Sequence, residues 1–256
     1  MVFCSISITT PKEIPLDKNS QLLAWEENGI IAIDKAAGVL SHPNPNGKRN
    51  SRNLLLADYI SEDECYEWMS PQGNTQRFYL CHRLDSPTSG LIIGSSDSNT
   101  ATLIKEKFAN REVRKTYHAV TRYNPKAKEG HWIDRLIEKR VDGKLRVERG
   151  NGCTCKANVR FLQKKKGENH LQLIELKPST GRTHQLRVQC MLRKMPIVGD
   201  KTYGDFSLNR KVKRESKLDR LCLHASTIEF SIRKNGHEIN FSCESPLPRL
   251  IGKVLS

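Results

Sequence analysis

The sequence lacks the features that mark membrane and secreted proteins. No apolar run approaches the roughly 20 residues that a transmembrane helix needs. The first residues contain no basic segment followed by an apolar one, so a signal peptide is not expected. Internal repeats and low-complexity linkers are absent as well. We therefore predict a cytoplasmic protein that has no membrane partner, and we also expect a monomer.

Cysteine pairs at metal-ligand spacing are also missing. The eight cysteines are scattered along the chain, with one C-x-C at Cys153 and Cys155 and no C-x-x-C. Because zinc sites usually take their ligands from closely spaced pairs, we predict no metal site. Most of the cysteines should be free thiols in a reducing compartment, and several should be packed as small hydrophobic side chains.

Negative charge is scarce relative to positive charge. Lysine and arginine number 43 against 28 aspartate and glutamate residues, so the formal net charge is +15 and the pI is near 9.6. The positive electrostatic field of so basic a protein favours a polyanionic partner. No basic amphipathic helix is long enough to lie on a bilayer, so the charge indicates nucleic acid rather than an anionic membrane.

The residues that are present fit one globular α+β domain. Hydrophobic residues make up 37% and charged residues 28% of the chain, which is the balance of a folded rather than a disordered protein. Residues 1–20 hold two prolines and little periodicity, so they predict an extended lead-in. A single domain is expected over residues 21–256.

Periodicity predicts the main elements of this domain. Alternation and short apolar runs predict strands over residues 29–34, 91–94, 115–121, 157–162, 171–176, 221–232 and 238–242. Helical spacing predicts helices over residues 98–111, from Thr183 and from Leu247, the first behind serine and aspartate capping candidates. The basic residues within 43–52 and 210–220 predict exposed loops that either bind phosphate or are solvated.

One stretch combines groups that suit catalysis. His82, Arg83 and Asp85 follow an apolar run, and Pro87 and Gly90 turn the backbone after them. A strand that ends in a turn is a common place for chemistry, because the rigid element positions an exposed side chain. Taken alone, Asp85 is either a turn aspartate that bonds its own backbone or a reactive carboxylate beside a cation, and turn aspartates are commoner.

Three motifs stand out along the chain: HRLDSPTSG at 82–90, KTY at 115–117 and GRTHQLRV at 181–188. Together they resemble the pseudouridine synthases, specifically the branch typified by RluA, which modifies ribosomal and transfer RNA. Shorter matches accompany them at Asp34-Lys35, Gly38, His42-Pro43, Gly199-Asp200, Tyr203-Gly204 and Leu223-His224-Ala225. Several independent motifs in the family's order carry far more weight than any one of them.

The sequence departs from the family pattern at two positions. Ala36 stands where relatives usually have proline, and Gln189 stands where they often have histidine. Many relatives also carry an N-terminal S4 RNA-binding domain, for which the lead-in here is too short. The related branch that has Gly-Arg-Leu-Asp in place of His-Arg-Leu-Asp fits less well.

The resemblance implies an α+β fold with a mixed, largely antiparallel central sheet, flanking helices and a basic catalytic cleft. It also implies RNA as the partner and an isomerisation as the reaction, in which uracil is cut from its ribose at N1, turned, and rejoined through C5. An isomerisation consumes nothing, and the sequence has no phosphate-binding loop of the Gly-Lys-Ser type. We therefore expect no cofactor and no catalytic metal.

The resemblance further assigns roles to single residues. Asp85 is implied as the catalytic residue, which either attacks C1′ or removes a ribose proton. Arg182 would pair with Asp85 and keep the carboxylate ionised. Tyr117 would stack on the flipped base, and Arg83 would enter the RNA stack and hold the target nucleotide out. Without the resemblance, a structural ion pair, a core tyrosine and a salt-bridged surface arginine are the alternative explanations, and the first two are the commoner cases.

Thr88 and His184 complete the candidate substrate-binding residues. A simpler explanation is that Thr88 shapes the turn and that His184 satisfies local hydrogen bonds. Two rival functions stay open at this point. A basic RNA-binding protein without catalysis would show the same charge, and a nucleoside or glycoside hydrolase would also use a carboxylate. The sequence does not identify the target uridine or choose between ribosomal and transfer RNA.

Overall fold

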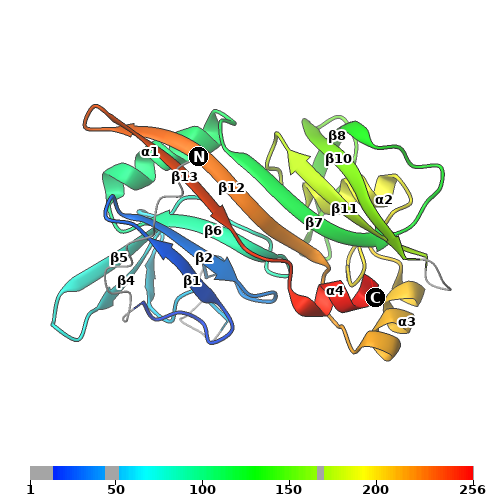
Figure 1. Ribbon diagram of the computed structural model, residues 1–256, viewed down its shortest axis with the longest axis horizontal. Coiled ribbons are helices and arrows are strands. Elements are labelled where there is room, and N and C mark those ends of the chain that lie inside the picture. Colours follow the sequence, from blue (N-terminus) through cyan, green and yellow to red (C-terminus); the bar gives the residue numbers. More distant parts are fainter. Residues whose placement is uncertain (1–13, 44–51, 166–169, 256) are drawn as a thin grey trace. The chain divides into compact units, whose positions relative to one another are not determined.

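The computed structural model describes residues 14–43, 52–165 and 170–255 of the chain (Figure 1). The chain divides into two compact units, Met1–Val113 with Thr227–Ser245 and Arg114–Ser226 with Pro246–Ser256. Each unit has its own hydrophobic core. The single domain expected over residues 21–256 stays a prediction, and most of the lead-in expected over residues 1–20 lies outside the described residues.

The described residues of the first unit form antiparallel strands and one helix, α1 (Ser98–Ala109). Its strands are β1 (Gln21–Trp25), β2 (Ile30–Lys35), β3 (Asp58–Ile60), β4 (Cys65–Met69), β5 (Thr75–Leu80), β6 (Ser89–Ser95), β13 (His237–Glu244) and the part of β12 (Leu223–Lys234) from Thr227 onward. β3, β4, β5 and β6 pair in that order, β2 lies between β1 and β6, and β12 pairs with β13. Figure 1 shows β1 to β6 in blue to cyan.

Strand β6 lies in the core of the first unit, because every one of its residues is buried. Leu91 and Ile93 pack in one cluster with Ala101 and Ile104 of α1 and with apolar side chains of β12 and β13. A run of apolar residues without alternation is typical of such a fully buried strand. The strand and the helix that follow the turn at Asp85 are therefore rigid elements.

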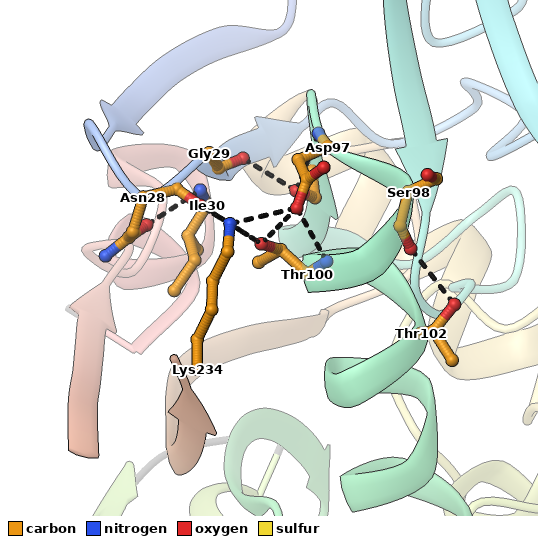
Figure 2. A network of polar contacts seen from close by, with 9 residues as sticks. Asn28, Gly29, Ile30, Asp97, Ser98, Thr100, Thr102 and Lys234 are labelled. Carbon is orange, nitrogen blue, oxygen red and sulfur yellow. Dashed lines mark hydrogen bonds and ion pairs between the residues drawn. The ribbon is translucent and has the colours of Figure 1, made fainter. Parts of the chain in front are cut away.

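A polar network fixes the start of α1 (Figure 2). The Asp97 carboxylate caps the helix by accepting from the Thr100 N–H at 2.9 Å and from the Thr100 hydroxyl at 2.7 Å. The Lys234 ammonium of β12 donates to the same carboxylate at 2.9 Å and to the carbonyl oxygen of Asn28 at 3.3 Å. Because the hydrogen bonds from Thr100 and Lys234 outweigh burial, the pKa of Asp97 is lowered to about 2.

The second unit, over its described residues, has a second set of antiparallel strands with three helices. Its strands are β7 (Arg114–Arg122), β8 (Gly130–Val141), β9 (Lys144–Arg149), β10 (Cys153–Lys165), β11 (Leu171–Pro178) and the first residues of β12, and its helices are α2 (Gln185–Leu192), α3 (Phe206–Ser216) and α4 (Arg249–Leu255). The strands pair in the order β7-β11-β10-β8-β9. Buried residues of β7, β10 and β11 form its core with Leu186, Val212 and Val254 of the three helices.

The loop expected over residues 210–220 is wrong for its first part, because residues 206–216 form helix α3. The Asp205 carboxylate caps this helix by accepting from the N–H groups of Ser207 and Leu208 at 3.1 and 3.0 Å. Val212 is buried, and Leu208 one turn earlier packs against the same core. These two apolar residues at i, i+4 anchor the helix, whose positions after Phe206 are otherwise polar or charged.

The other predicted elements are confirmed with shifts of a few residues at their ends. The strands expected at 29–34, 91–94, 115–121, 157–162, 171–176, 221–232 and 238–242 correspond to β2, β6, β7, β10, β11, β12 and β13. The expected helices correspond to α1, α2 and α4, and α2 begins at Gln185 rather than near Thr183. The basic loop expected at residues 43–52 lies largely outside the described residues, and its Arg52 is exposed.

No helix within the described ranges is long and apolar enough to cross a membrane. Among the same residues, no three histidine, cysteine, aspartate or glutamate side chains gather closely enough to hold a metal ion. The seven described cysteines are free thiols and five of them are buried. The prediction of free cysteines, several of them packed in the core, is confirmed for the part of the chain that the structure describes.

Candidate active site

Asp85 lies in the turn between β5 and β6 of the first unit. Its carbonyl oxygen accepts a hydrogen bond from the Thr88 N–H at 2.9 Å, which closes the predicted turn. The Asp85 side chain is half-buried, and Arg83 is exposed two residues earlier. Thr88 is only 2% exposed, which favours a role in shaping the turn. Asp85 is thus presented by a closed turn between two strands.

A buried lysine fastens the Ser86 side of this turn. Lys35, at the end of β2, is fully buried, and its ammonium donates to the carbonyl oxygens of Ala36 at 3.0 Å, Val39 at 2.8 Å and Ser86 at 3.1 Å. The Ser86 carbonyl also accepts from the Gly38 N–H at 2.7 Å. Gly38 has a φ of +91°, a conformation that favours glycine. Several carbonyl dipoles therefore replace the hydration of a buried charge and hold Ser86 in place.

A buried serine fastens the other side of the turn. The Ser41 hydroxyl donates to the Leu84 carbonyl oxygen at 2.9 Å and accepts from the Leu84 N–H at 3.0 Å. Leu84 and Ser86, the two neighbours of Asp85, are consequently both bonded to the segment that follows β2. The backbone of Asp85 is fixed from both sides by a segment more than 40 residues away in the sequence.

His82 has a structural position at the start of the motif. Its Nε2 accepts from the Ile93 N–H of β6 at 3.0 Å, and its ring stacks on Phe108 of α1 with 4.5 Å between centroids. The accepting Nε2 places the proton of a neutral ring on Nδ1. His82 thus ties the beginning of the Asp85 turn to β6 and α1.

Tyr117 lies in β7 of the second unit, opposite Leu176 of β11. Its side chain is half-buried and packs against the core of that unit. Burial lowers the pKa of the neighbouring Lys115. A Cβ atom on Gly181 would lie 3.6 Å from the Lys115 Nζ, so the K-x-Y strand and the turn that carries Arg182 are neighbours within the second unit.

Arg182 is an exposed residue in the turn before α2. The buried side chain of Gln185 supports this turn: its Oε1 accepts from the Arg182 N–H at 3.2 Å and from the Thr180 hydroxyl at 2.7 Å, and its Nε2 donates to the Lys156 carbonyl at 3.1 Å. The backbone of Arg182 is therefore fixed, while its guanidinium stays exposed. An exposed arginine on a rigid turn before a helix suits the binding of an anion.

Gln189, one of the two departures from the family pattern, extends this support. Its Oε1 accepts from the Gln185 Nε2 at 3.2 Å, and its Nε2 donates to the Asp134 carboxylate at 2.9 Å. Arg193 forms an ion pair with the same carboxylate at 2.8 Å. Glutamine at this position therefore serves as a buried link behind the Arg182 turn, and not as a contact with substrate.

His184 connects the same turn to a second buried network. Its ring lies against Tyr203, with 2.8 Å between the His184 Nδ1 and the Tyr203 hydroxyl. Arg187 of α2 pairs with Asp200 through two hydrogen bonds of 2.8 and 2.9 Å, and both side chains are buried. Burial alone would raise the pKa of Asp200, but the bonds from Arg187 outweigh it and the pKa is lowered. These contacts give His184 a structural role within the second unit, and its part in substrate binding stays a prediction.

The structure places the predicted residues in two groups. Arg83, Asp85 and Thr88 belong to the first unit, and Tyr117, Arg182 and His184 belong to the second. The pairing of Asp85 with Arg182 and the stacking role of Tyr117 stay predictions. Sequence reasoning gave no role to the residues that support the two turns, which are Lys35, Ser41, Gln185 and Gln189. The sequence held a signal for three of them: Lys35 ends an apolar strand, Gln185 belongs to the GRTHQLRV motif, and Gln189 departs from the family pattern.

Comparison with known proteins identifies the family. Residues 29–192 match the model of the RNA pseudouridylate synthase family. Over 255 residues the chain is 32% identical to the ribosomal large subunit pseudouridine synthase C of Rickettsia bellii, covering 99% of this chain and 76% of the relative. It is 30% identical to the tRNA pseudouridine synthase C of Vibrio vulnificus over 229 residues, covering 81% of this chain and 84% of the relative.

A solved structure supports the fold. Human RNA pseudouridylate synthase domain containing 1 superposes with a TM-score of 0.64 at 22% identity, covering 93% of this chain and 89% of that one. The predicted α+β fold of the pseudouridine synthases is confirmed, whereas the basic catalytic cleft stays a prediction. The chain belongs to the RNA pseudouridylate synthase family, whose members are isomerases that convert uridine in RNA to pseudouridine.

Proposed function

We propose that this protein isomerises uridine in ribosomal or transfer RNA and that Asp85 is its catalytic residue. The names of its relatives support both classes of RNA, since one acts on the large ribosomal subunit and another on tRNA. The observation that carries the proposal for Asp85 is the hydrogen bonding of its two neighbours, Leu84 and Ser86, to the buried side chains of Ser41 and Lys35. A side chain held on so rigid a backbone meets the requirement for precise positioning in catalysis.

The reaction conserves every atom of the uridine. The bond between N1 and C1′ breaks, the uracil turns, and a bond between C5 and C1′ forms. C5 then loses its hydrogen as a proton and N1 gains one. An ionised Asp85 can serve the first step by attacking C1′ or by removing a ribose proton. The proposal needs no cofactor and no metal, because nothing is oxidised, reduced or transferred to a second molecule.

The other residues of the proposed site support this chemistry. The guanidinium of Arg182 would favour the ionised form of Asp85, which burial around an enclosed base would otherwise destabilise. Tyr117 would offer a flat face on which the detached uracil can turn, since stacking does not fix a base in its plane. Arg83, exposed beside Asp85, would fill the place that the flipped nucleotide leaves in the RNA.

The proposal is tested by mapping pseudouridine in total RNA from cells with and without the gene. We expect one or a few uridines of ribosomal or transfer RNA to lose the modification, and expression of the wild-type protein to restore it. Expression of the Asp85→Asn variant should not restore it. An unchanged map in cells without the gene would contradict the proposed function.

Product analysis of the purified protein on the mapped RNA distinguishes the rival activities. The proposed isomerase gives pseudouridine and no free base. Release of free uracil as the main product would support a hydrolase, and tight RNA binding without any product would support a protein that binds RNA without catalysis.

A further inference from the structure

Three aromatic rings of the first unit form a cluster that the proposed mechanism does not use. Tyr59 of β3 lies directly opposite Tyr66 of β4, and their rings meet edge to face at 4.9 Å between centroids. The ring of His42 stacks on Tyr59 at 5.8 Å and 23° between planes. The three rings thus form a short series from the fully buried Tyr66 to the half-buried Tyr59 and His42.

This cluster is fixed to the turn that carries Asp85. The Tyr66 hydroxyl donates to the Ser41 carbonyl oxygen at 3.0 Å. The Ser41 hydroxyl in turn bonds both the N–H and the carbonyl oxygen of Leu84, the residue between Arg83 and Asp85. The position of the rings relative to the backbone of the turn is therefore set by buried hydrogen bonds.

Tyr59 lies within electrostatic reach of Arg83. Burial is the main reason why the pKa of Tyr59 is raised to about 12, and the positive charge of Arg83 acts in the opposite direction. Arg83 itself is exposed. A stacked pair of half-buried rings, one of them within electrostatic reach of an exposed guanidinium, matches the surfaces on which unpaired bases stack while the phosphates meet a positive charge.

We propose that His42 and Tyr59 form a stacking site for an unpaired base of the RNA substrate, next to the nucleotide that Arg83 holds out of the helix. This inference rests on the proposed function, because it places a second base beside the target uridine. The rings differ in exposure, and we assign them different roles. Tyr66 is fully buried and supports the cluster from the core, while Tyr59 and His42 keep accessible surface on which a base can stack. Stacking accepts any base, so the site selects an unpaired nucleotide and not a particular sequence.

The experiment pairs changes in the RNA with changes in the protein. A synthetic stem-loop that contains the uridine found by mapping is made intact and with a single abasic nucleotide at each loop position in turn. kcat and KM for pseudouridine formation are measured for the wild-type protein and for the variants Tyr59→Leu, Tyr59→Phe and Tyr79→Leu. Tyr79→Leu is the control, since it truncates another half-buried tyrosine of the same unit.

For the wild-type protein, we expect one abasic position near the target to raise KM roughly tenfold, the scale of one lost base–aromatic contact. Tyr59→Leu should raise KM by a similar factor on intact RNA and show no further rise on that abasic RNA. Tyr59→Phe should resemble the wild type, and Tyr79→Leu should keep the full effect of the abasic position. This non-additive pattern is expected of a direct contact and not of a general loss of stability.

Two results would overturn the inference. One is a wild-type protein that tolerates an abasic nucleotide at every position near the target, a result that does not depend on the folding of any variant. The other is a Tyr59→Leu variant whose rise in KM multiplies the rise caused by every abasic position, so that the two changes act independently. A wild-type protein that makes no pseudouridine in the intact stem-loop would instead contradict the proposed function.

Discussion

The fully buried ammonium of Lys35 supports the turn that carries Asp85. It donates to three carbonyl oxygens, one of them on Ser86, next to Asp85. A charge at this depth is stable only while those acceptors surround it. We infer that Lys35 is a positioning residue, which acts on the reaction through the backbone of the turn.

Replacing Lys35 by methionine tests this role. The change leaves buried carbonyl oxygens without their donor, which costs about 1–3 kcal/mol of unfolding free energy. The turn should loosen, so kcat should fall much more than the affinity for RNA. The measurements are thermal unfolding and steady-state kinetics on the mapped RNA.

Lys105→Met is the matched control for that variant. Lys105 pairs with Glu64 at the surface of the same unit, and such exposed pairs contribute about 0–1 kcal/mol. The control should therefore keep both its stability and its kcat. A Lys35→Met protein with a wild-type kcat would show that the fastening of Ser86 has no part in catalysis.

At the scale of the element, the start of α1 depends on a charged cap. Asp97 has a lowered pKa of about 2 in the folded protein, against about 3.9 for an unperturbed aspartate. A carboxylate whose pKa is lowered by folding contributes stability above the unfolded pKa and loses it as the pH falls through the folded pKa. The contribution of Asp97 should be complete near neutral pH and decline between about pH 4 and pH 2.

Asp97→Asn is the variant that isolates this charge, because asparagine still caps a helix. Urea unfolding at a series of pH values should find the variant less stable than the wild type at pH 7. The difference between the two proteins should shrink as the pH is lowered. A difference that stays constant down to pH 2 would mean that the negative charge of Asp97, which Thr100 and Lys234 both contact, adds no stability.

Helix α3 gives a second test at this scale. Val212 is 2% exposed in the core of the second unit, so Val212→Ala should lower the unfolding free energy by about 1–3 kcal/mol. Arg214→Ala, an exposed change in the same helix, should stay within about 0.5 kcal/mol of the wild type. Equal stability of both variants would indicate that α3 is not anchored through Val212.

The sequence predicted some elements of the structure better than others. Periodicity predicted α1 and β6, since their apolar residues follow the helical and the buried-strand pattern. It missed α3, because the five basic residues over 210–214 and 217 are typical of a solvated loop. Only two apolar residues, Leu208 and Val212, pack against the core. The turn at Asp85 was predicted from the proline and glycine of the 82–90 motif. The contact between Lys35 and Ser86 spans 51 positions and depends on how β2 is placed beside β6. No local pattern encodes such a contact.

At the scale of the whole molecule, the net charge of +15 dominates the expected binding of RNA. Each phosphate that a basic side chain neutralises releases counterions, so affinity falls as salt concentration rises. Between about 50 and 200 mM salt, we expect the affinity for the mapped RNA to fall at least roughly tenfold. Filter binding or fluorescence anisotropy measures the slope. An affinity that does not change with salt would contradict a binding mode based on this charge.

The central claim is that Asp85 performs the chemistry of a uridine isomerase. Its most direct test is single-turnover pseudouridine formation by Asp85→Asn on the mapped RNA, with Asp63→Asn as a control at an exposed acidic position of the same unit. We predict that Asp85→Asn lowers the rate at least about a thousandfold, the scale of losing a catalytic group, while RNA binding and thermal stability stay close to wild type. The control should react normally. Pseudouridine formation by Asp85→Asn at a rate near that of the wild type would contradict the claim.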